Sequence, residues 1–374
     1  MKLIIRNGHV IDATTDEKRD ILVEGTHITG QRPEGELMEI DAEGCYVFPG
    51  LIDFHAHLFS EGSQVAVYPD SMIPNGVTTA IDAGTSGCSA FCAQHAQMVQ
   101  SQCKVYSFLS VYTGGIFSGD FQENYDPELF DREAIKALKE KYPEEIKGLK
   151  IRIGEETIGA LSLKALEQTV SLADEIGSLR VCVHVSNSAY PQEEVVKLLR
   201  RGDIFCHVYQ GTKNNILDSR GKVKREIWDA RERGVIFDAA HGRWNFSHKV
   251  AEAAMGQGFL PDTISSDVTS QRYRWGCHAK SLPFIMSKFM AMGMELPDII
   301  ERVTKNPAAL LGISRARGTL KAGAAADIVI FKKKRKRVKF MDFEGNIIWG
   351  EEILVPQMTI KDGEIRYCQE DFFL

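Results

Sequence analysis

Two histidines within the first 60 residues of the chain have a spacing that suits metal binding. Residues 49–57 read Pro-Gly-Leu-Ile-Asp-Phe-His-Ala-His, so an apolar run follows a Pro-Gly break and ends in His55 and His57. Such a run predicts a buried strand. Residues two apart on a strand point to the same face, so two imidazoles at its end could hold one metal ion. Taken alone, the pair could equally be two core histidines that satisfy hydrogen bonds.

Further polar residues stand at or near the ends of four other apolar segments. Lys150 lies between apolar neighbours in 148–152, and the other segments end in His184, His207 and Asp267. In a parallel barrel the carboxyl ends of the strands meet at one face, where active sites form. The sequence therefore places four histidines, a lysine and an aspartate at one edge of the expected sheet.

The elements that must position these residues alternate between strand and helix patterns, as parallel α/β structure requires. About 260 residues, from Pro49 to about Gly312, are close to the usual length of a (β/α)8 barrel. We expect eight strands at 51–57, 77–82, 104–111, 148–153, 179–185, 203–208, 234–239 and 262–267. We expect helices at 131–142, 162–177, 192–201 and 296–311, with Ser162 capping the second.

Both ends of the chain have a different sequence pattern, in which short apolar strands alternate with turns. Leu3-Ile4-Ile5 and Ile21-Leu22-Val23 precede the barrel region, and residues 327–331 and 359–360 follow it. We expect the ends to pair into one β-sandwich. The predicted domains are therefore 1–48 with 320–374, a discontinuous sandwich, and 49–319, a barrel.

The stretch from Pro49 to His57 resembles the first barrel strand of the amidohydrolase superfamily, metal-dependent hydrolases built on a (β/α)8 barrel. The binuclear pattern of that superfamily is similar, position by position, to an ordered set of six residues here: His55, His57, Lys150, His184, His207 and Asp267. The resemblance covers nearly the whole chain, because 306–309 and 318–327 look like the usual return from barrel to sandwich. It implies an α/β fold, a (β/α)8 TIM barrel with a small terminal β-sandwich.

The resemblance also implies a cofactor and a mechanism. One divalent ion would be bound by His55, His57, Lys150 and Asp267, and the other by Lys150, His184 and His207. A protonated lysine cannot bind a metal, and in related enzymes this lysine is carboxylated by carbon dioxide. Imidazole and oxygen ligands suit zinc, with manganese, iron or cobalt as alternatives. A hydroxide bridging the metals would attack the substrate, and Asp267 would act as general base and then acid.

Candidate substrate residues come from the loops after the strands: Tyr112, Gly114, Arg152, Lys213, His241 and Arg243. Any of the three cations could bind a substrate carboxylate, or could instead be a structural ion-pair partner. His241 is the strongest of the group, because it precedes Gly242 just past the seventh strand.

The sequence looks closest to a dihydroorotase-like group of deacetylases that act on small acetylated hydroxy or amino acids. Dihydroorotases usually carry an arginine shortly after the second histidine, but here Leu58-Phe59-Ser60-Glu61 follows His57. We expect hydrolysis of an amide or ester bond in a small, anionic substrate. The alternatives are a cyclic amidohydrolase of the dihydroorotase or hydantoinase kind, an adenine deaminase-like enzyme, and a non-catalytic scaffold.

The composition excludes several other classes of function. The formal charge of −6 over 374 residues gives no indication of nucleic-acid or membrane-surface binding, and no apolar run is long enough to cross a bilayer. The basic run at 332–337 could be a nuclear-localisation or nucleic-acid segment, but we favour a solvated edge strand or loop. Eight scattered cysteines without an export signal are typical of reduced thiols. We expect a cytoplasmic homo-oligomer with a small-molecule substrate.

Overall fold

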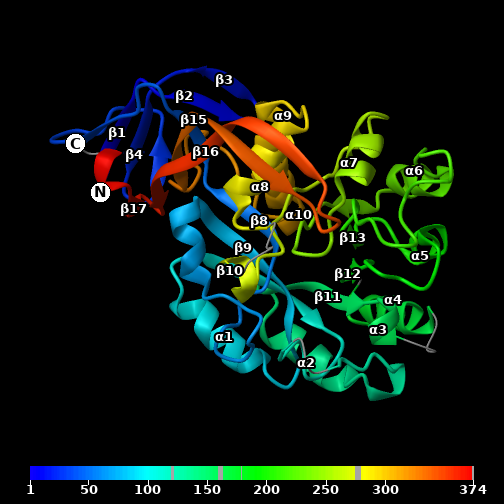
Figure 1. The fold of residues 1–374 in the computed structure, drawn as a ribbon. Helices are drawn as coiled ribbons and strands as arrows, with labels where there is room; N and C mark the ends of the chain where they lie inside the picture. Colours follow the sequence, from blue (N-terminus) through cyan, green and yellow to red (C-terminus); the bar gives the residue numbers. More distant parts are fainter. Residues whose placement is uncertain (119–121, 159–162, 178, 274–278, 373–374) are drawn as a thin grey trace.

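A parallel sheet of seven strands forms the centre of the larger part of the molecule (Figure 1). The structure, a computed structural model, describes residues 1–118, 122–158, 163–177, 179–273 and 279–372. The strands follow each other across the sheet in sequence order: β8 (Leu51–Ala56), β9 (Val77–Gly87), β10 (Lys104–Ser110), β11 (Ile146–Arg152), β12 (Arg180–His184), β13 (Ile204–Cys206) and β14 (Ile236–Asp238). The first seven predicted strands are therefore present.

The prediction of an eighth strand at 262–267 is wrong, because the structure has no continuous strand there. This segment joins the two edges of the sheet through isolated parallel bridges, from Asp238 to Thr263 and from Ala56 to Val268. The amide of Asp267 donates to the carbonyl of His55 at 2.7 Å. Asp267 has a φ of 49°, and this left-handed conformation interrupts the extended backbone that a ladder needs. The segment still closes the barrel, because it hydrogen-bonds to both sheet edges.

Helices follow the strands along the chain, and most of them cover the outer face of the sheet. They are α1 (Phe91–Gln100), α2 (Arg132–Lys141), α3 (Glu155–Ile158), α4 (Lys164–Glu175), α5 (Gln192–Leu198), α6 (Arg225–Arg233), α7 (His248–Met255), α8 (Leu282–Ala291), α9 (Leu296–Val303) and α10 (Lys305–Leu311). Short 3-10 turns are η1 (Pro69–Asn75), η2 (Pro127–Leu129), η4 (Ser270–Tyr273) and η5 (Glu370–Phe372). The carboxylate of Asp131 accepts from the amide of Ala134 and caps α2. Ser162, the predicted cap of the second helix, lies outside the described residues.

The single helix predicted at 296–311 is wrong, because the structure has two helices there. They meet at Thr304, whose φ and ψ are −137° and −80°. Pro307 follows three residues later and has no amide hydrogen, and its ring would clash with the Val303 carbonyl in a continuous helix. The chain therefore ends α9 and starts α10 in a new direction.

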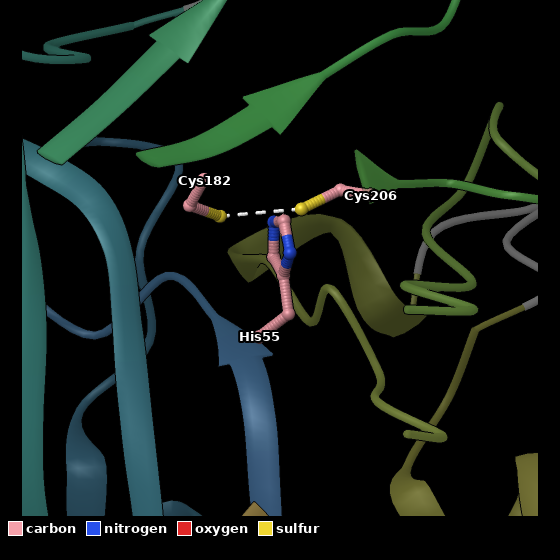
Figure 2. Close-up of side chains that lie close together, drawn as sticks. All are labelled: His55, Cys182 and Cys206. Atoms are coloured by element: carbon pink, nitrogen blue, oxygen red, sulfur yellow. Dashed lines mark hydrogen bonds between the residues drawn. The ribbon is translucent and has the colours of Figure 1, made fainter. Parts of the chain in front are cut away.

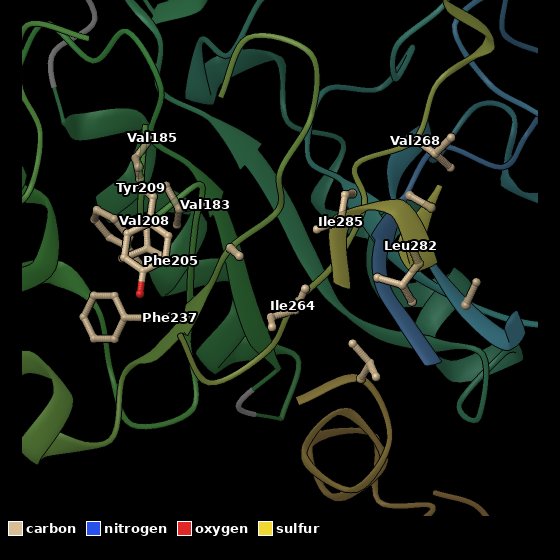
Figure 3. Packing of buried hydrophobic residues seen from close by; sticks show 14 of the residues in the cluster. Val183, Val185, Phe205, Val208, Tyr209, Phe237, Ile264, Val268, Leu282 and Ile285 are labelled. Carbon is tan, nitrogen blue, oxygen red and sulfur yellow. The ribbon is translucent and has the colours of Figure 1, made fainter. Parts of the chain in front are cut away.

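Side chains of the barrel strands alternate between two cores. Val183, Phe205 and Phe237 lie on the outer face, packed with the helices, and the ring centroids of the two phenylalanines are 5.4 Å apart (Figure 3). Their neighbours Cys182 and Cys206 point to the barrel interior, into a separate buried cluster. This period of two follows from strand geometry. The barrel strands therefore lie between two apolar layers.

The sandwich consists of two sheets, one from the N-terminal segment alone and one from both ends of the chain, which pair as expected. One has the order β5 (His27–Thr29), β4 (Ile21–Glu24), β1 (Lys2–Arg6) and β6 (Met38–Asp41). The other has the order β17 (Glu364–Cys368), β16 (Ile347–Lys361), β15 (Ile328–Met341), β7 (Tyr46–Pro49), β2 (His9–Asp12) and β3 (Thr15–Lys18). Leu3, Val23, Val47, Ile328 and Ile360 share one buried core between them. The domain limits given above stay a prediction.

The hairpin of β15 and β16 extends from the sandwich across α8 to α7 (Figure 1). At its tip, the Asp342 carboxylate accepts from the amide of His248 at 2.9 Å, and Glu344 accepts from the Ser247 hydroxyl at 2.7 Å. Beyond Phe331, every pairing of β15 within the described residues is with β16. The basic run 332–337 therefore lies on a solvated strand edge.

Candidate active site

Two histidines at the end of β8 face one carboxylate. His55 and His57 are buried, and their ring centroids are 6.0 Å apart. His57 Nδ1 lies 2.9 Å from Thr85 Oγ1, and His55 Nδ1 lies 3.4 Å from Asp238 Oδ2. Their Nε2 atoms lie 3.3 Å (His57) and 3.7 Å (His55) from Asp267 Oδ1. The outer partners orient each ring so that its Nε2 meets the carboxylate.

Asp267 is fixed from its other side. Its Oδ2 accepts a 3.0 Å hydrogen bond from the Asn245 side-chain amide. Gly242 has a φ of 53°, and a Cβ there would collide with both Asp267 Oδ2 and Asn245 Nδ2. Burial alone would raise the pKa of Asp267, but the hydrogen bond with His57 and the nearby imidazoles hold it well below its usual range. The carboxylate is therefore ionised and tightly enclosed.

Two more histidines complete the cluster at the ends of β12 and β13. The His184 and His207 ring centroids are 4.3 Å apart, and His207 lies 5.2 Å from His55. His207 Nδ1 donates to the Ala240 carbonyl at 2.7 Å, while its buried Nε2 has no hydrogen-bond partner among the described residues. Burial lowers the pKa of His207 to about 3 and holds that of His184 well below its usual range. Neutral imidazoles with an unpaired nitrogen are the metal-binding form, so these residues fit a metal site.

Lys150 lies among these rings on β11 and is 2% exposed. Its Nζ lies 3.3 Å from His55 Nε2 and 3.6 Å from Cys182 Sγ. A Cβ on Gly84 would lie 2.5 Å from Lys150 Cγ, so a glycine is needed beside the lysine stem. Burial opposes the charge, but the thiols and Asp267 outweigh it and raise the pKa of the free amine. An ammonium has no lone pair, so Lys150 could bind a metal only after it loses its proton or is modified.

A pocket of about 510 Å³ opens above this cluster. We call its lower residues the floor, which consists of His55, His57, Lys150, His184 and Asp267. We call the residues around its mouth the rim, which includes Gln122, Glu123, Arg152, Glu156, Arg243, Trp244, Asn245 and Gln271. The pocket brings five of the six predicted metal ligands to one surface, and His207 lies beside His184.

The two arginines of the rim have different partners. Arg152 Nη1 donates to Glu123 Oε2 at 2.7 Å, and its Nη2 lies 3.7 Å from Glu156 Oε1. Arg243 Nη1 donates to the neutral Gln271 amide oxygen at 2.7 Å, and its guanidinium lies 4.4 Å from the centroid of the Trp244 ring. Arg152 is therefore neutralised by acidic side chains, whereas Arg243 meets neutral groups in the part of the chain that is described.

Four other predicted substrate residues lie outside the described lining of this pocket. His241 is buried, with Nε2 2.8 Å from Lys288 Nζ and Nδ1 2.9 Å from the Gly242 carbonyl. The Tyr112 ring packs against Tyr125, Gly114 lies against the Tyr112 ring, and Lys213 is exposed. Their substrate roles stay predictions, and the pocket adds no support for them.

Several residues that shape the site were missed from the sequence. Asp238 and Thr85 orient the histidines of β8, Asn245 holds Asp267, and Glu123 neutralises Arg152. Asp238 stands in the apolar run of the seventh strand, where a buried acid indicates a hydrogen-bonding role. Glu123 and Asn245 lie in irregular segments, and their sequence context gives no comparable indication.

The comparisons with known proteins agree with this geometry. The model of the Amidohydrolase family matches residues 46–365. The chain belongs to the amidohydrolase family. This amidohydrolase is 30% identical to a deacetylase of Enterococcus faecalis over 97% of this chain and 98% of that protein. It is 26% identical to a deacetylase of Agrobacterium fabrum over 88% of this chain and 81% of that protein.

Solved structures give the same fold. A crystal structure of an adenine deaminase superposes on this amidohydrolase with a TM-score of 0.90 at 29% identity, over 98% of this chain and 99% of that one. A crystal structure of a dihydroorotase gives a TM-score of 0.89 at 24% identity with the same coverage, and shows the fold alone. The predicted superfamily, the barrel with its terminal β-sandwich and the hydrolase class are thus confirmed. No helix in the described ranges has the length and apolar character that crossing a membrane requires.

Proposed function

We propose that this amidohydrolase is a metal-dependent deacetylase that cleaves the acetyl amide or ester of a small carboxylic acid. The observation that carries the proposal is the floor, where three imidazoles, a buried lysine and an ionised aspartate line one pocket, with the fourth imidazole, of His207, beside His184. The full-length similarity to two deacetylases supports the acetyl group. The expected homo-oligomeric state and cytoplasmic location stay predictions.

The floor is proposed to hold two divalent ions. His55, His57 and Asp267 already form a group whose ligand atoms lie within 4.8 Å of one another. By resemblance, Lys150 carboxylated by carbon dioxide would join this group and also join His184 and His207 in holding a second ion. Imidazole nitrogens with carboxylate oxygens suit zinc. Ions bound there would lower the pKa of a water molecule to about 7 and polarise the acyl carbonyl.

Asp267 is the proposed proton carrier. It is ionised, and its Oδ1 faces His55 and His57, so Oδ2 is the atom left to take a proton. Asn245 donates to that oxygen and holds it at the floor. Asp267 would accept the proton of the attacking water and return it to the leaving nitrogen or oxygen, as general base and then acid.

Arg243 is the proposed receptor for the substrate carboxylate. A guanidinium binds a carboxylate through two parallel hydrogen bonds, provided that no acid already occupies it. Arg152 is held by Glu123 and Glu156, whereas Arg243 has a neutral partner in Gln271. Trp244, which is 57% exposed beside Arg243, offers an apolar face for the remainder of the substrate.

The alternative substrates fit this pocket less well. A cyclic amidohydrolase of the dihydroorotase kind would need a cation just after His57, but Leu58 and Phe59 are buried there, and the Leu58 amide donates to Asp82 at 2.8 Å. Adenine is uncharged and would leave Arg243 without a counter-charge. The similarity to an adenine deaminase structure makes adenine the first competing substrate to measure.

The test is a substrate panel with zinc-loaded protein. N-acetyl and O-acetyl derivatives of small hydroxy and amino acids are compared with their methyl esters, with dihydroorotate and hydantoin, and with adenine. We expect acetate release from the acids at least about tenfold faster than from the matched esters, which lack the negative charge. Ammonia from adenine, or ring opening without acetate release, would contradict the proposal.

Metal analysis tests the centre independently of the substrate. Elemental analysis should give about two ions per chain, and the mass of the intact protein under native conditions should include one added carbon dioxide, which is absent in Lys150→Ala. One ion per chain with unmodified Lys150 would contradict the binuclear centre, even if acetate were released.

A further inference from the structure

Two thiols and the imidazole of His55 meet inside the barrel (Figure 2). Cys182 on β12 and Cys206 on β13 project inward from neighbouring strands, and their Sγ atoms are 3.2 Å apart. A ring nitrogen of His55 and both sulfurs all lie within 4.8 Å of one another. None of the three residues is more than 1% exposed. The proposed mechanism uses neither thiol.

The same three side chains already surround one cationic atom. Lys150 Nζ lies 3.3 Å from His55 Nε2, 3.6 Å from Cys182 Sγ and 4.0 Å from Cys206 Sγ. The three donor atoms therefore converge on a point that accommodates a positive charge. Sulfur and imidazole ligands are the set that thiophilic ions prefer over oxygen ligands.

We propose that His55, Cys182 and Cys206 form a site for a thiophilic metal ion such as Cd²⁺, Cu⁺ or Zn²⁺, distinct from the His55, His57 and Asp267 group. Each thiol releases one proton to solvent as its sulfur–metal bond forms, so the step needs no oxidant or reductant. Metal–sulfur bonds of about 2.3 Å at tetrahedral angles place two sulfurs roughly 3.8 Å apart. The sulfurs would separate by about 0.6 Å, whereas a disulfide of about 2.05 Å requires them to close by more than about 1 Å.

Occupation of this site excludes the proposed catalytic centre. His55 belongs to both donor sets, and the ammonium of Lys150 occupies the space between them. A metal ion a few ångströms from an ammonium in a buried site is strongly unfavourable, so Lys150 must move or lose its proton. A thiophilic ion should therefore inhibit the enzyme until a chelator removes it. This consequence rests on the proposed function, whereas the binding site itself does not.

The test uses the full chain, stripped of metal and kept reduced with a phosphine that contains no thiol. Cd²⁺ is titrated in, and thiolate-to-cadmium charge-transfer absorption in the near ultraviolet is recorded. The wild-type band should exceed that of Cys182→Ala/Cys206→Ala by the signal of one Cd²⁺ with two thiolates. Cys103→Ala, which removes another fully buried thiol, should keep the wild-type band.

Two results would overturn the proposal. One is an equal band in the wild type and the folded double variant. The other is a wild-type protein whose Cys182 and Cys206 form a disulfide that persists under the reductant. If the double variant does not fold, the single variants Cys182→Ser and Cys206→Ser replace it. Each should lose the charge-transfer absorption of one thiolate and keep that of the other.

A second readout separates this proposal from the catalytic one. Cd²⁺ should inhibit acetate release by the wild type and by Cys103→Ala, and chelation followed by zinc should restore the rate. A charge-transfer band without any acetate release would refute the proposed function and leave the metal site standing. Full acetate release with the thiolate band saturated would refute the exclusion between the two sites.

Discussion

The floor and the rim of the pocket are held by different kinds of structure. Floor residues lie in or at the ends of barrel strands or, for Asp267, in the segment that closes the barrel. All but the half-buried His184 are buried, and His57 and Asp267 have a second contact behind them, with Thr85 and Asn245. Most of the rim lies beyond the barrel strands, although Arg152 is the last residue of β11. Arg243 and Trp244 lie in an irregular segment and are fixed mainly by each other and by Gln271. Strand ends move little, whereas loops vary in length and composition. Under the proposed function, the strand ends would supply the chemistry and the rim would select the substrate.

The largest expected effect comes from the centre of the floor. Lys150→Ala should abolish measurable turnover and reduce bound metal, because the variant lacks the proposed link between the two ions. Short carboxylic acids with bicarbonate should restore part of the activity by occupying the space that the side chain leaves. Metal content and acetate release are measured together. Full activity of Lys150→Ala without added acids would contradict the proposed role of Lys150 in linking the two ions.

Asp267→Asn tests whether the floor moves a proton. The amide keeps the shape of the side chain but cannot accept a proton, so turnover should fall by about 100- to 10,000-fold while much of the metal is retained. Rate constants and metal content are measured on the same preparation. Turnover at the wild-type rate would assign the proton transfer to another residue.

Gly242→Ala tests whether the floor depends on its close packing. The added methyl group collides with Asp267 and Asn245, and a displacement of about 1 Å in a catalytic group costs roughly 100-fold in rate. Gly293→Ala is the matched control, because Gly293 also has a positive φ, of 89°, but nothing within 4 Å of an added Cβ. Equal losses in both variants would attribute the effect to backbone strain and not to the carboxylate.

The rim should respond more weakly and depend on the charge of the substrate. Arg243→Met should raise KM for acetylated acids about 10- to 100-fold, the cost of a charged hydrogen-bonded pair, and leave kcat nearly unchanged. For the methyl esters, KM and kcat of this variant should equal those of the wild type. Steady-state kinetics on both substrate series provide the measurement.

Arg152→Met is the counterpart within the rim and should have the smallest effect on KM. It leaves the buried Glu123 carboxylate unpaired, so the free energy of unfolding should fall by about 2–3 kcal/mol. This is below the loss for a fully buried pair, because the Arg152 side chain is 25% exposed. Denaturant unfolding measures the stability. A KM change as large as that of Arg243→Met would remove the distinction between the two arginines.

The sequence was informative where strand ends carry polar residues, and less so elsewhere. His55, Lys150 and His184 could be placed because an apolar strand pattern fixes both the end of the strand and the face of each side chain. The eighth strand was overestimated, since the left-handed backbone of Asp267 depends on tertiary contacts that no local pattern encodes. His241 was expected in the pocket, but a position after a strand does not fix a side-chain rotamer, and its ring contacts Lys288. Glu123, the partner of Arg152, lies in an irregular segment 29 residues earlier in the chain, so no local sequence pattern links the two.

The pairing of β7 with β15 imposes an order on how the molecule is completed during synthesis. β7 ends at Pro49, and its partner begins only at Ile328, so the ribosome releases the whole barrel region before the six-stranded sheet can close. Until then, one edge of β7 has unpaired backbone groups, and α7 and α8 lack the hairpin that later crosses them. Exposed strand edges bind other strands, so the nascent chain is most prone to aggregation in this interval. β15 and β16 therefore end that interval when they emerge, by covering the edge and contacting the two helices.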